Sequence, residues 1–425
     1  MNILVLGSGG REHSISWKLA QSSKMDKLYI VPGNAGTHEL GENVEISVND
    51  FEGIKEFIKK NQINMLIVGP EEPLVKGITD FLRHDPQLKK LIIIGPDKKG
   101  ALLEGSKDFA KSFMQKYGIP TAQYKSFDAS SVDEAYEFLN TLNPPYVLKA
   151  DGLAGGKGVV ILENIKKARA ELAQMFEGKF GEAGKKVVIE EFLNGIELSV
   201  FVLTDGKNYK LLPEAKDYKQ IGEGNTGLNT GGMGSVSPVP FVDDAFMNEV
   251  EHEIIQPTIQ GLMNEGINYQ GFIFFGLMKV EDKPLVVEYN VRMGDPEAEA
   301  VIPRIETDLV SLFEKLPNQQ LDEMELEINP RAVGSVMMVS GGYPEKYEKG
   351  KVITGLNSYN PDTLIFHAGT KTMEDQVITS GGRVLAITSY GDDIFNALNH
   401  SYETIRHITF ENAYYRKDIG FDLKA

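Results

Sequence analysis

The first hundred residues repeat one pattern four times, a short hydrophobic run that stops at a glycine. The runs are NILVLG (2–7), KLYIVPG (27–33), NMLIVGP (64–70) and KLIIIGP (90–96), with helix-compatible segments between them. Continuous apolar strands that alternate with helices are typical of a parallel sheet covered on both faces. Such sheets bind ligands at the carboxyl ends of their strands. We therefore predict a parallel α/β domain over 1–104, with a candidate site at its glycine-bearing edge.

A helix is predicted over 106–117. The segment SKDFAKSFMQKY opens with a capping serine, places aromatic residues at helical spacing and ends at Gly118. Lys107 lies in the first turn, where a cation opposes the helix macrodipole. This lysine is therefore either a small tolerated cost or a residue directed at an anion.

The pattern then changes to shorter elements. A small α+β unit is predicted over about 122–195, where the strands YVLKA and GVVIL flank a glycine-rich loop and a helix follows over 164–176. A hairpin, a helical stretch and two long strands come next. After Pro330, short strands and turns lead to a helix near 392–407. This last part, 328–425, is predicted to be a separate α+β module.

Composition narrows the possible functions of this 425-residue chain. Its formal charge of -17 argues against a general nucleic-acid or anionic-membrane binder, because such proteins neutralise phosphates with surface Lys and Arg. The sequence contains no cysteine, which excludes disulfides, thiolate metal sites and a thiol nucleophile. No leader is evident, and no apolar run approaches the ~20 residues that span a membrane. We expect a cytoplasmic protein.

The first glycine loop, GSGGRE (7–12), joins a strand to a helix. A dinucleotide-binding fingerprint would place glycine at position 12 and an acidic residue about 20 residues later. Position 12 is Glu and the next strand ends in VPGNAGT, which disfavours a nicotinamide or flavin dehydrogenase. Free amides at the helix start, with Arg11 beside them, suit a single phosphate. A close-packed turn explains the loop equally well.

The second glycine loop, KADGLAGGKG (149–158), does not match a Walker A motif, because its spacing is too short and Lys157 is followed by glycine. It connects two predicted antiparallel strands, so it is either a long hairpin turn or a flap that approaches phosphates through its glycine backbone. A third loop, 217–235, is glycine-rich and predicted to lack regular structure. It is either disordered or substrate-binding, and the absence of charge runs favours the second interpretation.

The segment LVVEYNVRMGD (285–295) suggests a metal site. Strand alternation puts Glu288, Asn290 and Arg292 on one face. A carboxylate and an amide oxygen two residues apart can converge on one hard cation such as Mg²⁺, and the neighbouring arginine suits phosphoryl oxygens. The alternative is an ordinary half-exposed strand with one polar face.

These motifs occur together in a series that resembles a known family. KADGLAGGKG, EEFLNG (190–195), NTGGMG (229–234) and EYNVRMGDPE (288–297), in this order and spacing, are similar to the ATP-grasp ligases. Within them they resemble the phosphoribosylamine-glycine ligase, or glycinamide ribonucleotide synthetase, family. The resemblance covers essentially the whole chain, from GSGGREH and PGNAGT at the front to HAGTK, TSGGRVL and YYRKDIG at the end.

The resemblance implies a fold and an activity. The fold would comprise the N-terminal parallel α/β domain (1–104), an ATP-grasp domain (105–315) whose mobile subdomain covers about 122–195, and the C-terminal α+β domain (328–425). The activity would join glycine to 5-phosphoribosylamine with ATP and Mg²⁺ or Mn²⁺, through a glycyl phosphate. Two alternatives remain open: another ATP-grasp carboxylate-amine ligase or carboxylase, and a catalytically silent nucleotide-binding protein.

The resemblance also implies roles for individual residues. Those acting on the reacting groups would be Arg292, Lys149 and Asp217. Those contacting the phosphates of ATP would be Lys107, Lys149, Gly155, Gly156 and Lys157. Those facing the adenine and ribose would be Glu190, Glu191, Phe192, Leu193 and Glu197. The metal would be held by Glu288 and Asn290.

Substrate binding would involve two further groups. The phosphate of phosphoribosylamine would meet Gly9, Gly10, Arg11, Gly33 and Asn34. The amine and glycine would meet the third loop, including Gly231, Gly232 and Met233. This chain departs from the usual family pattern there: it has DYKQ for DHKR, NTGLNTGGMG for DTGPNTGGMG and MGDPEAEA for FGDPETQ. The departures leave the substrate-loop geometry open. A monomer or weak dimer without nucleic-acid or membrane partners is expected.

Overall fold

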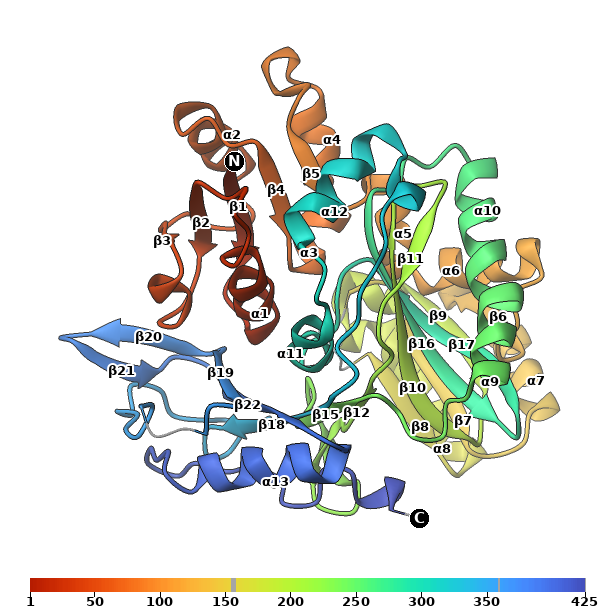
Figure 1. The fold of residues 1–425 in the computed structure, drawn as a ribbon. Helices are drawn as coiled ribbons and strands as arrows, with labels where there is room; N and C mark the ends of the chain where they lie inside the picture. The colour runs from red at the N-terminus through yellow and green to blue at the C-terminus, as the bar shows by residue number, and fades with distance from the viewer. Residues whose placement is uncertain (154–157, 358–359, 425) are drawn as a thin grey trace.

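The computed structural model describes residues 1–153, 158–357 and 360–424 (Figure 1). Its N-terminal part is a parallel five-stranded sheet of order β3-β2-β1-β4-β5. The four glycine-terminated runs form β1, β2, β4 and β5 as predicted, and the short edge strand β3 was not predicted. The strands are β1 (Asn2–Gly7), β2 (Lys27–Pro32), β3 (Glu42–Asn43), β4 (Met65–Val68) and β5 (Ile92–Ile94). The helices are α1 (Gly10–Leu19), α2 (Phe51–Lys60), α3 (Glu71–Lys76), α4 (Ile78–Arg83) and α5 (Lys98–Gly105).

The predicted helix after this sheet is confirmed as α6 (Lys107–Tyr117). The Ser106 hydroxyl accepts a hydrogen bond from the Phe109 amide, and Gly118 ends the helix in the left-handed conformation with φ of 67°. Glycine adopts this conformation without the steric penalty that a Cβ brings. The position of Lys107 in the first turn is therefore fixed by a capped helix.

A central antiparallel sheet of order β11-β10-β16-β17 follows, as predicted for the hairpin and the two long strands. Its strands are β10 (Ile196–Thr204), β11 (Tyr209–Leu211), β16 (Gly271–Val280) and β17 (Lys283–Asn290). The helices α9 (Asp244–Val250) and α10 (Gln256–Asn264) form the predicted helical stretch. Leucine, valine and phenylalanine side chains of this sheet and of the N-terminal sheet belong to the same buried clusters, so the two parts share a hydrophobic core.

The small unit predicted over about 122–195 is a four-stranded antiparallel sheet of order β6-β9-β7-β8. Its elements are β6 (Tyr124–Asp128), α7 (Val132–Thr141), β7 (Tyr146–Ala150), β8 (Val159–Leu162), α8 (Ile165–Gln174) and β9 (Lys186–Glu191). It has a hydrophobic cluster of its own that includes Leu148, Leu172 and Ile189. A separate core allows this unit to move as a body.

The C-terminal sheet combines distant parts of the chain. Its order is β12-β15-β18-β22-β19, so two strands from the third glycine loop join three strands from beyond residue 330. The strands are β12 (Lys216–Asp217), β15 (Gly234–Ser237), β18 (Ala332–Val339), β19 (Thr363–His367) and β22 (Arg383–Gly391). The helix α13 (Ile394–Ile405) packs on it, and α11 (Glu297–Val301) and α12 (Leu309–Lys315) precede it (Figure 1).

The third loop was predicted to lack regular structure, and the structure differs on this point. Between β12 and β15 it forms the two-stranded ribbon β13 (Gln220–Gly222) and β14 (Thr226–Asn229). Short polar strands rich in glycine have no hydrophobic alternation, which explains why the pattern did not predict them. A second ribbon, β20 (Thr370–Met373) and β21 (Gln376–Thr379), projects from the C-terminal sheet (Figure 1).

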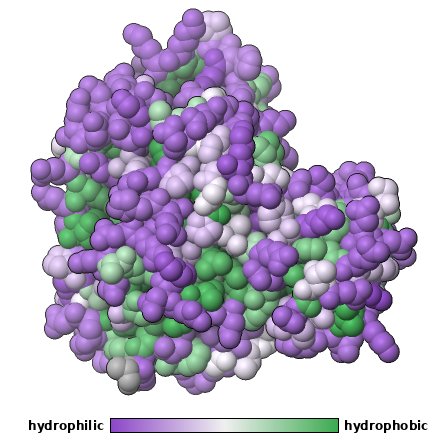
Figure 2. Space-filling view, turned by 90° about the vertical axis from the view of Figure 1, so that its right-hand side faces the viewer, coloured by the Kyte–Doolittle hydropathy of each residue, from purple (hydrophilic) through white to green (hydrophobic). Residues whose placement is uncertain are grey.

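The surface is mostly polar on the face that Figure 2 shows. Hydrophobic residues are exposed mainly in the lower half of this face. Among the described residues, no helix is both long and apolar enough to cross a membrane.

Two histidines lie buried where the N-terminal and C-terminal parts meet. The backbone amide of His367, at the end of β19, donates to Nδ1 of His13 on α1 over 2.7 Å. Burial lowers the pKa of His13 to about 3 and that of His367 to about 4. Both rings are therefore neutral in the folded protein and bind protons only on unfolding in mild acid.

This pair predicts a loss of stability in acid. Because the unfolded histidines bind protons below pH 6.5 and the folded ones do not, stability decreases as the pH falls from 6.5 towards 4. We expect about 2 kcal/mol lost per histidine between pH 7 and pH 5. Thermal unfolding at both pH values should show it, and H13Q/H367Q should lose most of this dependence. If exposed H252Q changes the pH dependence equally, the interpretation fails.

Candidate active site

A cavity of about 540 Å³ lies where the three main parts of the chain meet. It is bounded by the central strand β17, the small sheet's β7, the helices α5 and α6, and the loop that follows β12. Asp217 of β12 and Arg383 of β22, both from the C-terminal sheet, also reach it. Nearly half of the residues that line it are charged, which suits a charged ligand.

Two lysines predicted to meet phosphates line this cavity. Lys107 Nζ donates to the Gly152 carbonyl over 3.0 Å, so the first turn of α6 contacts the base of the second glycine loop. Lys149 Nζ lies 3.3 Å from the Val287 carbonyl oxygen and 2.9 Å from Glu190 Oε2. Burial lowers the pKa of Lys107. Lys107, the cation that opposes the α6 macrodipole, thus lines the cavity.

Glu190 also forms an ion pair with a second lysine, Lys111. Its Oε2 lies 3.2 Å from Lys111 Nζ, and Lys111 also donates to Thr121 Oγ1 over 2.7 Å. Burial lowers the pKa of Lys111 to about 8. The other carboxylate oxygen of Glu190 is buried and has no hydrogen-bond partner among the described residues. Glu190 itself lines the cavity, and a buried acceptor without a partner calls for a hydrogen-bond donor from outside the described residues.

Glu288 and Asn290 come from the same face of β17, as predicted. A β-bulge at Val287 interrupts the pairing with β16 just before them, because Leu277 pairs with Val286 and Gly276 pairs with Glu288. Bulges redirect side chains and backbone at binding sites. Here the bulge directs the Val287 carbonyl to Lys149 while both polar side chains line the cavity.

The charge around Glu288 favours its ionised form. Burial opposes ionisation, but the cations Lys219, Lys149, Lys107 and Arg292 together hold the pKa of Glu288 below its ordinary value. Asn290 is buried, and its Nδ2 has no partner among the described residues. The ionised carboxylate of Glu288 and the side-chain amide oxygen of Asn290 are oxygen ligands of the kind that a hard divalent cation prefers.

Arg292, the third residue of this face, is held by two acids. Its Nη2 lies 2.6 Å from Glu104 Oε1 on α5, and its Nε lies 3.5 Å from Glu71 Oε2 on α3. The Val291 amide donates to the other oxygen of Glu104 over 2.8 Å. These contacts fix the guanidinium at the cavity wall.

The segment after Ala215 adds one acidic and one basic side chain to the cavity. Asp217 and Lys219 both line the cavity, and Lys219 forms an ion pair with Glu197. Burial opposes the charge of Lys219, but Asp217, Glu197 and Glu288 raise its pKa well above the ordinary value. Burial also raises the pKa of Asp217. Lys219 is therefore a permanent cation between the predicted ribose contact and the predicted metal ligand.

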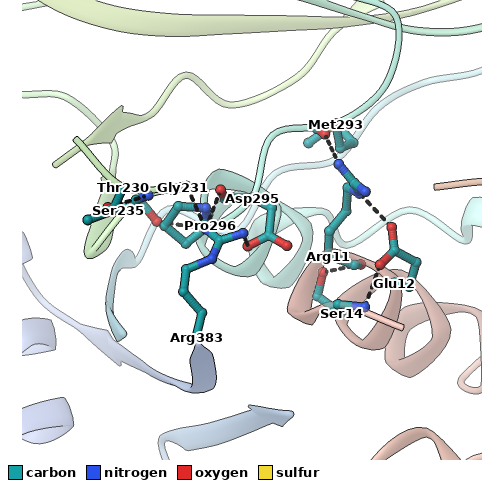
Figure 3. A network of polar contacts seen from close by, with 12 residues as sticks. Arg11, Glu12, Ser14, Thr230, Gly231, Ser235, Met293, Asp295, Pro296 and Arg383 are labelled. Atoms are coloured by element: carbon teal, nitrogen blue, oxygen red, sulfur yellow. Dashed lines mark hydrogen bonds and ion pairs between the residues drawn. The ribbon is translucent and has the colours of Figure 1, made fainter. Parts of the chain in front are cut away.

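A second cavity of about 500 Å³ lies on the other side of an ion pair. Arg383 Nη2 lies 3.0 Å from Asp295 Oδ1, and Arg383 Nη1 donates to the carbonyls of Asp295 and Gly231 over 2.7 and 2.5 Å (Figure 3). These two charged residues line both cavities. Gly9, Gly33 and Lys371 line the second cavity only, so the Asp295–Arg383 pair separates two compartments of one site.

Arg11 and Gly9 face different compartments. Arg11 Nε lies 2.6 Å from Glu12 Oε1 and its Nη1 donates to the Met293 carbonyl over 3.3 Å, which places it in the first cavity (Figure 3). The Gly9 amide donates to Glu12 Oε2 over 2.7 Å. Glu12 therefore already occupies the start of α1, and a phosphate there would have to share these donors.

Most of the chain matches one family of proteins in three successive pieces. Residues 1–104 match the phosphoribosylglycinamide synthetase N domain, 105–298 its ATP-grasp (A) domain, and 333–422 its C domain. The chain belongs to the phosphoribosylglycinamide synthetase family. A phosphoribosylamine--glycine ligase from Caldanaerobacter subterraneus subsp. tengcongensis is 44% identical over 421 residues, 99% of each chain. One from Pseudomonas aeruginosa is 43% identical over 426 residues, 99% of this chain and 98% of that one.

Solved structures agree with this family. Phosphoribosylamine--glycine ligase from Thermotoga maritima is 34% identical, with a TM-score of 0.85 over 98% of this chain and 100% of that one. Biotin carboxylase from Campylobacter jejuni is 14% identical, with a TM-score of 0.73 over 97% of this chain and 92% of that one. The second likeness shows only that the fold is shared. The predicted resemblance and fold class are therefore confirmed.

In this member of the synthetase family, several predicted residues lie away from the first cavity. Glu191 and Phe192 line a smaller neighbouring cavity beside Pro144, and Leu193 follows them. The Met233 side chain is buried in the hydrophobic cluster of the C-terminal sheet. Gly232 precedes it with φ of 115°, where an added Cβ would meet the Pro296 ring. Gly232 and Met233 therefore fix the backbone of the third loop, and the Met233 side chain does not face the first cavity.

Two predicted phosphate contacts have structural partners in this synthetase-family chain. Asn34 donates to the carbonyls of Ser8 and His367 over 2.9 and 2.7 Å, so it joins the N-terminal and C-terminal parts. Gly10 is buried against Glu299, whose Oε1 would lie 2.1 Å from a Cβ added at Gly10. The predicted contacts of Gly155, Gly156 and Lys157 lie outside the described residues.

Sequence reasoning missed several residues of the site. Lys111 lies one helical turn after Lys107, and Lys219 lies on the same strand face as Asp217, so periodicity could have found both. Glu104 and Arg383 had no comparable local signal. They reach the cavity from α5 and β22 only through tertiary packing.

Proposed function

We propose that this protein is an ATP-dependent ligase that joins glycine to 5-phosphoribosylamine, giving glycinamide ribonucleotide, ADP and phosphate in purine synthesis. Family membership over the full chain supports the reaction. The structural observation that carries it is the ionised Glu288, which faces the same cavity as Lys107, Lys149 and Lys219. A triphosphate and a carboxylate can meet there only if cations neutralise their charge.

In this proposal ATP lies in the first cavity. Lys107 and Lys149 contact its phosphates, next to the start of the second glycine loop at Gly152. The free oxygen of Glu190 and the linker of Glu191, Phe192 and Leu193 face the base. Glu197 faces the ribose hydroxyls from its ion pair with Lys219.

Glu288 and Asn290 would hold one divalent cation, Mg²⁺ or Mn²⁺. Among the described residues, no three His, Cys, Asp or Glu side chains converge as a metal-binding group. That result fits a site of one carboxylate and one amide, because phosphate oxygens and water complete the coordination of such ions. The bound cation would supply charge neutralisation at the phosphates.

The chemistry proceeds in two steps that need no enzyme nucleophile. An oxygen of the glycine carboxylate bonds to the γ-phosphorus as the bond to the bridging β–γ oxygen breaks, which releases ADP. The amine nitrogen of phosphoribosylamine then bonds to the acyl carbon, phosphate leaves, and the nitrogen loses a proton. Arg292 would steady the transferring phosphoryl group, and Asp217 would face the amine.

The second cavity would hold the phosphosugar. Gly9, Gly33 and Lys371 line it, and Gly231 stands at the boundary with the first cavity. Gly10, Arg11, Asn34, Gly232 and Met233 would shape this region mainly through backbone and packing. The proposed domain limits are 1–104, 105–315 with a movable unit at about 122–195, and 328–425. A cytoplasmic monomer or weak dimer completes the proposal.

Phosphate release from ATP tests this function. With glycine and with phosphoribosylamine generated in situ, purified protein should release phosphate, and omission of either substrate should reduce release to the background rate. Release without glycine, or release driven by bicarbonate, would favour a different ATP-grasp ligase or carboxylase. No release with ATP binding intact would favour a silent nucleotide-binding protein.

A further inference from the structure

We propose that residues 414–422, near the end of the chain, position the substrate loop of the active site. This inference rests on the proposed function, because it concerns how Asp217 and Lys219 are presented to substrates. The C-terminal segment does not line the cavity in the described structure; it holds the loop from behind. Its residues are therefore positioning residues and not catalytic ones.

The segment 216–219, which begins with β12 (Lys216–Asp217), directs alternate side chains to opposite sides. Asp217 and Lys219 line the first cavity. The alternate residues face away, where Tyr218 donates its hydroxyl to Asp422 Oδ1 over 2.7 Å and Lys216 Nζ lies 3.2 Å from Asp422 Oδ2. Because side chains alternate along a strand, fixing one face sets the direction of the other. Asp422 thus sets the orientation of the two cavity residues.

Arg416 anchors the next part of the loop. Its side chain is fully buried and makes a bidentate pair with Asp418, with both N–O distances at 2.8 Å. Its Nη1 donates to the Gln220 carbonyl over 3.1 Å and to Asn225 Oδ1 over 2.9 Å. The guanidinium also lies 5.4 Å from the centre of the Tyr218 ring. A planar cation with five donors is suited to joining several segments at once.

The ribbon β13–β14 depends on these contacts. All four residues of β14 are exposed, so the ribbon buries little hydrophobic surface of its own. Instead, the Gly224 amide donates to Asp418 Oδ2 over 2.7 Å and the Tyr414 hydroxyl donates to the Ile221 carbonyl over 3.0 Å. A two-stranded ribbon in water is at best marginally stable alone. Its order therefore comes from the C-terminal segment.

This arrangement also accounts for one departure from the family pattern. Position 218, where the family pattern has histidine, carries a tyrosine that faces Asp422 and lies away from the cavity. Burial raises the pKa of Tyr218, so the phenol remains a hydrogen-bond donor at neutral pH. In this proposal Tyr218 holds the loop, and its neighbours Asp217 and Lys219 contact the substrate.

Two conservative variants test the proposal, Tyr218→Phe and Asp422→Asn. Each should lower kcat/KM for glycine about 10-fold, while KM for ATP changes less than twofold. Because Tyr218 and Asp422 act through one contact, the double variant should lose little more than the worse single variant. Tyr390→Phe is the matched control, since its hydroxyl donates to the Pro303 carbonyl over 2.7 Å in the same domain. It should retain wild-type kinetics.

A measurement independent of catalysis completes the test. Hydrogen exchange of the amides over 217–231 should be faster in Y218F and D422N than in wild type or Y390F. Faster exchange with unchanged kinetics would overturn the positioning role, as would equal behaviour of all three variants in both experiments. If wild type itself shows no glycine-dependent turnover, the proposed function fails, and the exchange result alone decides whether the segment holds the loop.

Discussion

Replacing Glu288 by glutamine is expected to lower turnover at least about 100-fold, because the cavity loses its only ionised β17 carboxylate beside the lysines that we propose bind phosphate. Glutamine keeps the size of the side chain but not the charge that a divalent cation needs. Steady-state phosphate release at saturating ATP and glycine measures the effect. Glu214→Gln is the matched control, since Glu214 accepts from the Val239 amide over 2.9 Å in the same region and should tolerate the change.

Stability separates this role from a structural one. Although burial opposes ionisation of Glu288, four cations keep its pKa below 4.5, so the ionised form stabilises the fold above that pH. The melting temperature of E288Q should therefore fall by no more than about 4 °C at pH 7. The difference from wild type should shrink as the pH falls below 4.5. A large drop in stability with turnover preserved would show that β17 is an ordinary polar strand.

Replacing Lys149 by methionine is expected to lower kcat/KM for ATP about 100-fold, because a cation at the cavity wall is lost. The fold should survive, since Glu190 keeps Lys111 as an ion-pair partner at 3.2 Å. Initial rates at varied ATP and fixed glycine measure the change. Lys186→Met, on the adjacent strand β9, removes a pair with Asp108 at 2.7 Å and serves as the control.

Two outcomes would contradict a direct contact between Lys149 and ATP. If K149M melts well below wild type but turns over ATP normally, then Lys149 serves only to neutralise Glu190. If K149M and K186M lose activity to the same extent, general loss of positive charge explains the result. Only a selective loss in K149M supports direct contact with the nucleotide.

Local pattern predicted the elements that carry most of the site. Four glycine-terminated runs placed the N-terminal strands, a serine cap and a glycine bounded α6, and alternation put Glu288, Asn290 and Arg292 on one face. Such signals depend on neighbours within a few residues, so one sequence suffices to detect them.

The same pattern could not place the partners of these residues. Arg292 faces a carboxylate on α5, nearly two hundred positions earlier, and Arg383 faces Asp295 from the C-terminal sheet. The bulge at Val287 could not be predicted from the sequence either, because a hydrophobic run has the same pattern with or without a bulge. Periodicity reports which face of an element is buried and says nothing about what covers it.

The sequence by itself thus determined the order of the elements, the charge-bearing faces and, through its series of motifs, the family. Only the tertiary structure decided that β12 and β15 join a sheet formed beyond residue 330, that one ion pair lines both cavities, and that Asp422 contacts Tyr218 in the third glycine loop. The reason is physical: hydrogen bonds along a helix or a turn connect near neighbours, whereas sheet order and buried ion pairs connect segments whose separation along the chain is unrelated to their distance in space.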